Sequence, residues 1–252
     1  MKRIPIITHS LFYIFMIVSV ITGYFKDFFF IMLLITIHEF GHIITSRIFK
    51  WNIEKVIILP FGGLTVFKED INRPLKEELL ITIMGPLMQV IGYLFLRNWI
   101  IDQSFTYYHY FILYFNLLPI IPLDGSKLIN IFNNYIYSFW KSQNITLIIS
   151  FITLLLLYFF CIRLNFNIIL YLILFFLLVE GFKEYRRKKF VFNRFLLERY
   201  QKHYHFKKRI LVYHGLEKEM RRDFNHLFYI KEKWYTEREF LARMFDFTNK
   251  LW

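Results

Sequence analysis

The strongest constraint on this chain is a series of long apolar runs that a water-soluble fold could not bury. Of the 252 residues, 56% are hydrophobic and 21% are aromatic, and the mean hydropathy is positive. One run, Phe28–Phe49, is long enough to cross a bilayer, because a helix of about 20 residues spans the hydrocarbon core. The composition therefore predicts a polytopic membrane protein.

Six apolar segments are candidates for membrane spans, and the first and last are short. They are Leu11–Tyr24, Phe28–Phe49, Leu79–Ile100, Tyr107–Ile121 with an uneven continuation toward Trp140, Ile145–Ile162 and Asn167–Val179. Lys2 and Arg3 fit the beginning of a signal peptide, but a cleavage site needs small residues and the only alanine is Ala242. We therefore expect the first segment to remain as a membrane anchor.

The distribution of charge predicts the orientation in the membrane. An even number of spans puts both termini on one side, and cytoplasmic segments are rich in Lys and Arg. Residues 183–252 carry 19 Lys/Arg against 9 Asp/Glu, which is +10 of the total charge of +13. We expect both termini to be cytoplasmic, with a transmembrane domain over residues 1–182 and a basic cytosolic domain over residues 183–252.

His38-Glu39-Phe40-Gly41-His42 lies inside the second apolar run. On a helix, residues four apart share one face, so both imidazoles can bind one Zn²⁺ while Glu39 acts as the base for an attacking water. Ionisable groups at membrane depth are costly and usually functional. The alternative is that the three side chains only form hydrogen bonds between helices.

A catalytic zinc ion needs three protein ligands and an open position, so a further ligand is expected at membrane depth. Asp124 is the best candidate, because Pro119 and Pro122 interrupt the helical pattern before it and Gly125 frees the backbone after it. The carboxylate can then project sideways from a broken segment.

Other ionisable residues fit a third ligand less well. Glu180 lies beside Lys183 and is typical of an interfacial ion pair. His109 lies at the outer start of its span, and His203 and His205 lie in the solvated tail. The single cysteine, Cys161, excludes an intramolecular disulfide and a cysteine-based zinc site.

These motifs resemble those of the site-2 proteases, which are intramembrane zinc metalloproteases, and among them the stage IV sporulation proteases. The similar segments are His38–His42, Asn116–Gly125 with its Asn-x-x-Pro-x-x-Pro-Leu-Asp-Gly pattern, Leu59–Leu64, Gly85-Pro86 and Tyr185–Tyr200. Gln89 and Ser126 depart from the family, which usually has asparagine and glycine there.

The resemblance implies a role for each of these residues. His38, His42 and Asp124 would bind one catalytic Zn²⁺, and Glu39 would serve as general base and then as acid. Asn116, together with Pro122, Gly62 and Gly63, would bind or orient the substrate.

Residues 53–67 are β-branched and aromatic, with a Pro-Phe-Gly-Gly break in the middle. This pattern predicts a β-hairpin at the membrane surface. Its edge could pair with an unwound substrate by strand addition. The alternative is a loop that only covers the zinc helix.

The tail predicts a small α/β module. Arg209–His214 and Leu227–Lys231 are typical of strands, and Thr236 with Glu239 forms a capping box for a helix through Phe245. The module resembles a reduced cystathionine-β-synthase (CBS) domain, without a clear expectation of nucleotide binding. The basic run adjoins a membrane span, so we expect the bilayer or a cytosolic substrate as its partner and no nucleic acid.

The sequence therefore predicts an all-α polytopic membrane protein with about six transmembrane helices, a small membrane-surface β-hairpin and a small α/β cytosolic C-terminal domain. The predicted function is an intramembrane zinc endopeptidase. By resemblance, it would remove the pro-sequence of a sporulation sigma factor under membrane-embedded inhibitors or regulators, in the mother-cell membrane around the forespore.

Two other classes of protein stay open from the residues alone. A catalytically silent, zinc-containing membrane scaffold would keep the same ligands and bind partners through its tail. A transporter could use buried His, Glu and Asp as a proton relay, although the two halves show no recognisable inverted repeat.

Overall fold

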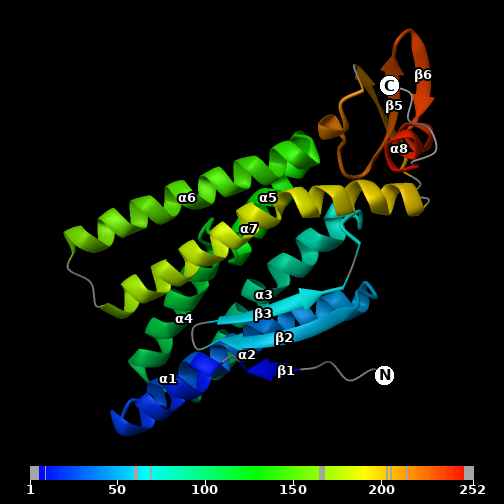
Figure 1. The fold of residues 1–252 in the computed structure, drawn as a ribbon. Coiled ribbons are helices and arrows are strands. Elements are labelled where there is room, and N and C mark those ends of the chain that lie inside the picture. Colours follow the sequence, from blue (N-terminus) through cyan, green and yellow to red (C-terminus); the bar gives the residue numbers. More distant parts are fainter. Residues whose placement is uncertain are drawn as a thin grey trace. The chain divides into compact units, whose positions relative to one another are not determined.

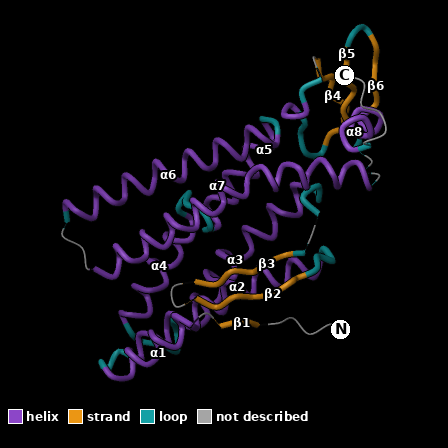
Figure 2. Tube along the Cα trace, viewed as in Figure 1, coloured by secondary structure: helices purple, strands orange, loops and turns teal. Residues whose placement is uncertain are grey.

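A computed structural model describes residues 6–8, 10–59, 62–68, 70–164, 168–202, 204, 206–213 and 215–246 (Figure 1). Most of this described chain is helical (Figure 2). Its internal contacts divide the chain into two compact units. The first comprises residues 1–69 and 77–118, and the second comprises residues 70–76 and 119–252.

Within the described residues, the first unit holds four helices and a small sheet. The helices are α1 (Ser10–Ile21), α2 (Phe25–Ile48), α3 (Leu75–Leu96, whose first two residues belong to the second unit) and α4 (Gln103–Leu117). The strands are β1 (Ile6–Thr8), β2 (Ile53–Leu59) and β3 (Gly62–Phe67), in the order β1-β2-β3. Strand β3 also packs against α2.

The hairpin expected over residues 53–67 is confirmed. Strands β2 and β3 are antiparallel, with Ile58 opposite Gly63 and Leu59 opposite Gly62. Strand β1, which the sequence did not indicate, pairs in parallel with β2. A three-residue strand is too short to show the alternation by which strands are recognised, so only its partner reveals it.

Helices α2 and α3 approach closely at glycines. A Cβ atom on Gly41 would lie 2.2 Å from the carbonyl oxygen of Met84, and one on Gly92 would lie 2.7 Å from Cγ2 of Ile37. Small residues permit such close helix packing in membranes. The close packing therefore restricts the position of α2 relative to α3. The side chains on α2 are fixed relative to α3 in the same way.

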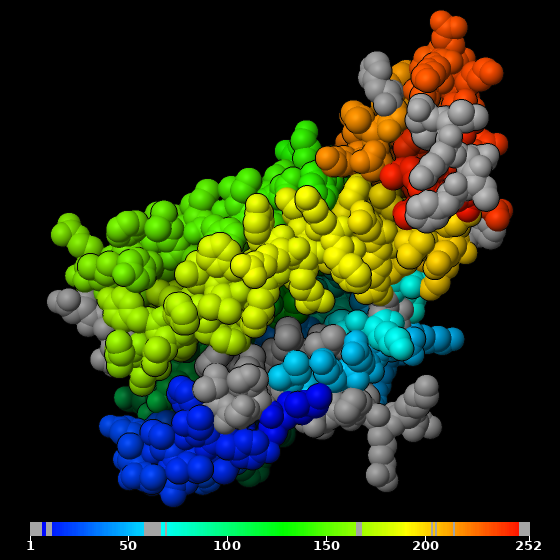
Figure 3. Space-filling model, viewed as in Figure 1, coloured from blue at the N-terminus to red at the C-terminus, as the bar shows by residue number. Residues whose placement is uncertain are grey.

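The second unit is built from helices α5 (Asp124–Ile136), α6 (Phe139–Arg163), α7 (Ile168–Gln201) and α8 (Glu237–Phe245) and a second sheet. In the space-filling view, the yellow side chains of α7 lie beside the green ones of α6 (Figure 3). Helix α7 continues through residue 183, because the Lys, Arg and Glu residues there favour a helix as strongly as Leu does. Residue 183 therefore lies inside one continuous helix, and the division into two domains at this residue stays a prediction.

The tail is a small α/β module with a three-stranded sheet. Strands β4 (Lys208–Tyr213) and β5 (Phe224–Ile230) are parallel, and β6 (Lys233–Thr236) is antiparallel to β5. The predicted capping box is confirmed, with Thr236 and Glu239 bonded reciprocally at the start of α8. Strand β6 was missed, because only five residues separate the end of β5 from the cap of α8. The prediction assigned the first of them, Lys231, to the preceding strand and the other four to no strand. A likeness to a CBS domain stays a prediction.

Three helices of the described chain are long and apolar enough to cross a membrane: α2, α3 and α6. Helix α1 is apolar but shorter. Large apolar side chains on these and other helices face outward, among them Ile48 (70% exposed), Leu156 (63%) and Phe175 (64%). Exposed apolar surface of this extent is typical of contact with lipid. The count of six spans stays a prediction.

The segment Asp70–Lys76 belongs to the second unit, although it leads directly into α3. The backbone N–H of Ile71 donates to Glu198 of α7 at 2.7 Å. Nδ2 of Asn72 donates to the carbonyl oxygen of Phe195 at 3.1 Å, and the N–H of Leu75 donates to Asp223 at 3.1 Å. The C-terminal part of the chain thus holds this segment along its length.

Candidate metal centre

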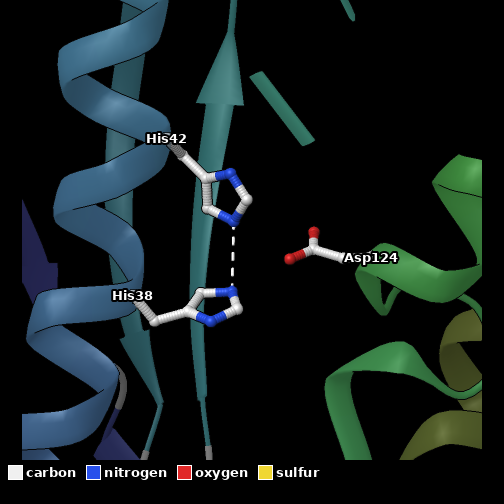
Figure 4. Close-up of side chains that lie close together, drawn as sticks. All are labelled: His38, His42 and Asp124. Atoms are coloured by element: carbon white, nitrogen blue, oxygen red, sulfur yellow. Dashed lines mark hydrogen bonds between the residues drawn. The ribbon is translucent and has the colours of Figure 1, made fainter. Parts of the chain in front are cut away.

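His38 and His42 lie on one face of α2, as their spacing predicted. Both side chains are buried, and their Nε2 atoms are 3.1 Å apart (Figure 4). Two nitrogen ligands of a tetrahedral zinc ion, each bonded at about 2.0–2.1 Å, lie about 3.3 Å apart. The observed separation is close to that value.

Helix α3 determines which nitrogen of His42 is available. Nδ1 of His42 lies 2.8 Å from the backbone carbonyl oxygen of Ile81. A carbonyl oxygen can only accept, so Nδ1 carries the hydrogen and Nε2 of the neutral ring keeps its lone pair. Metal-binding histidines almost always use their other nitrogen in this way.

The equivalent nitrogen of His38 contacts an amide. Nδ1 of His38 lies 3.0 Å from Oε1 of Gln89, which is an acceptor. With both Nδ1 atoms donating, two Nε2 lone pairs face each other in a buried site. Two imidazoles oriented in this way through their Nδ1 atoms are a donor set that fits a metal ion.

Gly85 makes room for the two rings. A Cβ atom at this position would lie 2.2 Å from Nε2 of His42 and 2.9 Å from Nε2 of His38. Any side chain larger than hydrogen would therefore displace the imidazoles. This gives a physical reason for glycine in the Gly85-Pro86 pair.

Asp124 begins α5 after a broken segment. Helix α4 ends at Leu117, and Leu118 and Leu123 are extended before Pro119 and the first turn of α5. A carboxylate in the first turn interacts favourably with the N-terminal end of the helix. Asp124 also pairs with Lys127 at 2.9 Å. The broken segment expected before Asp124 is therefore present.

The side chains of His38, His42 and Asp124 are drawn together in Figure 4. All three are buried, and one potential ligand atom from each lies within 4.8 Å of the others. Two neutral imidazoles and a carboxylate are a donor set that zinc accepts in catalytic sites. Glu39, adjacent to His38 on α2, is also buried.

The residues expected to orient substrate lie in both units. Asn116 is half-buried near the end of α4, where its Nδ2 donates to the carbonyl oxygen of Ile112 at 3.1 Å. Pro122 is half-buried in the turn before Asp124. Gly62 and Gly63 begin β3 and pair with β2. Their substrate roles stay predictions.

The rival ligands are placed elsewhere. Glu180 pairs with Lys183 at 2.6 Å. His109 is buried on α4 and stacks on Tyr93, with ring centroids 3.9 Å apart. Cys161 is buried without a disulfide, whereas His203 and His205 lie outside the described residues.

Three contacts at the site were missed from the sequence. They are the Ile81 carbonyl to His42, the Gln89 amide to His38 and the Lys127 ammonium to Asp124. Only the last carried a usable signal, because residues three apart on a helix are neighbours. Every residue has a backbone carbonyl, so the residue type at position 81 does not indicate this contact.

Comparison with known proteins agrees with this geometry. The profile of peptidase family M50 matches residues 27–101. Stage IV sporulation protein FB of Bacillus subtilis (strain 168) is 37% identical over 203 residues, which cover 76% of this chain and 70% of that protein. A zinc metalloprotease of Methanocaldococcus jannaschii is 31% identical over 163 residues, covering 56% of this chain and 46% of that protein.

A solved structure, the site-2 protease from Methanocaldococcus jannaschii, matches with a TM-score of 0.59 and 26% identity, covering 73% of this chain and 92% of that one. Together with the apolar helices, these matches show an integral membrane protein with a site-2 protease fold. The chain belongs to peptidase family M50 and is a site-2-type intramembrane metalloprotease.

Proposed function

We propose that His38, His42 and Asp124 hold one zinc ion and that Glu39 is the general base of peptide-bond hydrolysis. The observation that carries this proposal is the pair of Nε2 atoms 3.1 Å apart, with the Nδ1 atom of each ring in contact with an acceptor on α3. When bound, zinc supplies Lewis-acid activation of water and of the scissile carbonyl.

Two protein side chains are proposed to transfer the proton and to orient the substrate. Glu39 accepts a proton from the attacking water and returns it to the leaving amine. Asn116 donates a hydrogen bond that orients the substrate carbonyl, which requires its Nδ2 to exchange the bond to Ile112 for one to substrate. Burial of Glu39 and the ligands keeps bulk water away from these groups.

The β2–β3 hairpin is the proposed holder of the substrate. A transmembrane substrate must unwind before hydrolysis, because in a helix its peptide groups are bonded to each other. Strand β3 is at one edge of its sheet, opposite β1. An unwound segment can add to this edge, with Gly62 and Gly63 allowing close approach of its backbone.

The proposed substrate is the pro-sequence of a membrane-associated sporulation sigma factor. Two observations support it: the likeness to stage IV sporulation protein FB over most of the chain, and the motifs shared with the sporulation proteases. We place the enzyme in the mother-cell membrane around the forespore, with six spans, both termini cytoplasmic, and membrane-embedded regulators. The basic tail, a reduced CBS-like module, would face the cytosolic part of the substrate.

Co-production in a heterologous host tests this proposal. The protein is made with a candidate pro-sigma factor, and wild type is compared with Glu39→Gln, which keeps shape and removes the base. We expect the substrate to lose its pro-sequence only with the wild-type protein. If the folded, zinc-loaded wild type leaves the substrate intact, the pro-sigma assignment is wrong, and turnover of no membrane protein substrate at all would favour the scaffold.

A further inference from the structure

Gln89 bridges two helices at the level of the proposed zinc ligands. It lies on α3, fully buried, four residues after Gly85. Its Oε1 atom is 3.0 Å from Nδ1 of His38 on α2, and its Nε2 atom is 3.1 Å from the backbone carbonyl oxygen of His109 on α4. His38, Gln89 and His109 all belong to the first unit.

The orientation of this amide follows from its partner on α4. The carbonyl oxygen of His109 can only accept, so the amide nitrogen of Gln89 must face it. The amide oxygen then faces His38, whose Nδ1 must donate. Nε2 of His38 is consequently left with its lone pair directed at Nε2 of His42, 3.1 Å away.

A second contact holds α4 in the required position. One helical turn beyond Gln89, Tyr93 stacks on the ring of His109, with centroids 3.9 Å apart and planes 7° apart. The hydroxyl of Tyr93 also donates to Thr106 at 3.2 Å. The register of α3 against α4 is therefore set by two adjacent turns, and the carbonyl oxygen that orients Gln89 stays in place.

We propose that Gln89 is a positioning residue for the metal site, in which the His109 carbonyl orients the Gln89 amide and the amide fixes the tautomer and ring plane of His38. This inference rests on the proposed zinc ligation by His38 and His42. A neutral amide suits the position, because it orients the ring without placing a second negative charge at membrane depth.

Zinc affinity of the full chain in detergent micelles tests the inference. Gln89→Met keeps the length of the side chain and removes both hydrogen bonds, so we expect zinc to bind about 10- to 100-fold more weakly. Gln89→Glu keeps an acceptor for His38 and, when protonated, a donor for His109, so we expect it to rescue binding. In the cobalt-substituted protein, Gln89→Met should also change the visible absorption bands.

Thr82→Val is the matched control, because Thr82 is buried on the same helix and its hydroxyl donates to a backbone carbonyl oxygen of that helix, the one of Glu78, at 2.8 Å. It should leave zinc affinity and the cobalt spectrum unchanged. Wild-type zinc affinity and an unchanged cobalt spectrum in Gln89→Met would overturn the inference. Equal losses in Gln89→Met and Thr82→Val would also overturn it, because they would show a general effect of removing buried polar groups.

His42→Ala separates this inference from the proposed function. If His42→Ala loses zinc while Gln89→Met keeps it, the ligand assignment stands and the role of Gln89 is wrong. If His42→Ala binds zinc as tightly as wild type, the ligand assignment itself is wrong, whatever Gln89→Met does.

Discussion

Two buried polar clusters, one in each unit, are built from different groups: the first contains two neighbouring histidines, and the second contains an ion pair. At His38 and His42, the Nδ1 atom of each ring contacts a neutral acceptor, a backbone carbonyl or an amide, and the two Nε2 atoms lie 3.1 Å apart. Around Arg199 the partners are charged or strongly polar, and the guanidinium donates to Asn72, Glu237 and two backbone carbonyls. The first cluster contains two of the proposed zinc ligands, whereas the second contains a buried ion pair between Arg199 and Glu237.

The charges in the second cluster are mutually stabilised. Burial alone would raise the pKa of Glu237, but the hydrogen bond from His226 and the charge of Arg199 lower it below its ordinary value. His226 donates from Nδ1 to Glu237 at 2.8 Å and accepts at Nε2 from the N–H of Arg221 at 2.9 Å. The comparison predicts that mutations in the two clusters have separable effects on zinc and on stability.

The largest expected effect is that of Gly85→Ala. Its new Cβ would overlap the His42 ring, with 2.2 Å to Nε2. Zinc affinity should fall by more than about 100-fold, beyond the range for residues that only orient a ligand. The measurement is zinc titration of the purified protein.

Gly181→Ala is the control for Gly85→Ala. A Cβ on Gly181 would meet Phe151 at 3.4 Å, an ordinary contact, so zinc affinity should not change. Tight zinc binding by Gly85→Ala would contradict the described placement of the two rings.

Arg199→Met should destabilise the tail without affecting zinc. It removes the buried partner of Glu237 and the donor to Asn72, and loss of one member of a buried ion pair costs about 3–5 kcal/mol. Hydrogen exchange of the β5 amides measures the change in free energy of unfolding.

Arg194→Met is the matched control for Arg199→Met. Arg194 is partly exposed and forms an ion pair with Glu198, four residues later on the same helix, and such a pair contributes about 0.3–0.5 kcal/mol. Loss of zinc from Arg199→Met would contradict the expectation that the two clusters affect zinc binding and stability separately.

Acidification should have the smallest effect on the stability of the tail. Burial lowers the pKa of His226 below its ordinary value, outweighing the hydrogen bond to Glu237 that raises it. The unfolded chain therefore takes up the proton first, so this contribution is complete above about pH 6.5 and is lost as the pH falls below it.

Glu237 stays ionised over the range from pH 7 to 5, because its pKa is below its ordinary value. The free energy of unfolding of β5, followed by hydrogen exchange between pH 7.5 and 5, should decrease, and His226→Gln should remove most of this slope. A slope unchanged in His226→Gln would show that another group is responsible.

The features that the sequence predicted correctly depend on residues close together in the chain. The spacing of His38 and His42, the hairpin over residues 53–67 and the capping box at Thr236 are local patterns, and each is present in the structure. The broken segment before Asp124 followed from Pro119 and Pro122.

The rest depends on long-range contacts that residue types do not reveal. Strand β1 exists through its pairing with β2, and the attachment of Asn72 to Arg199 joins residues 127 positions apart. The site shows the same limit, because the Ile81 carbonyl is a backbone group that any residue would supply. Continuity of α7 past residue 183 was missed because hydropathy changes there while helix propensity does not.

The most direct test of the central claim is the zinc content of the purified full-length protein, measured by atomic emission for wild type, His42→Ala and Asp124→Ala. We predict about one zinc ion per wild-type chain and a large loss in both variants, because a site with two of its three protein ligands binds zinc poorly. Full zinc content in His42→Ala or in Asp124→Ala, with the fold intact, would contradict the assignment of that residue as a ligand.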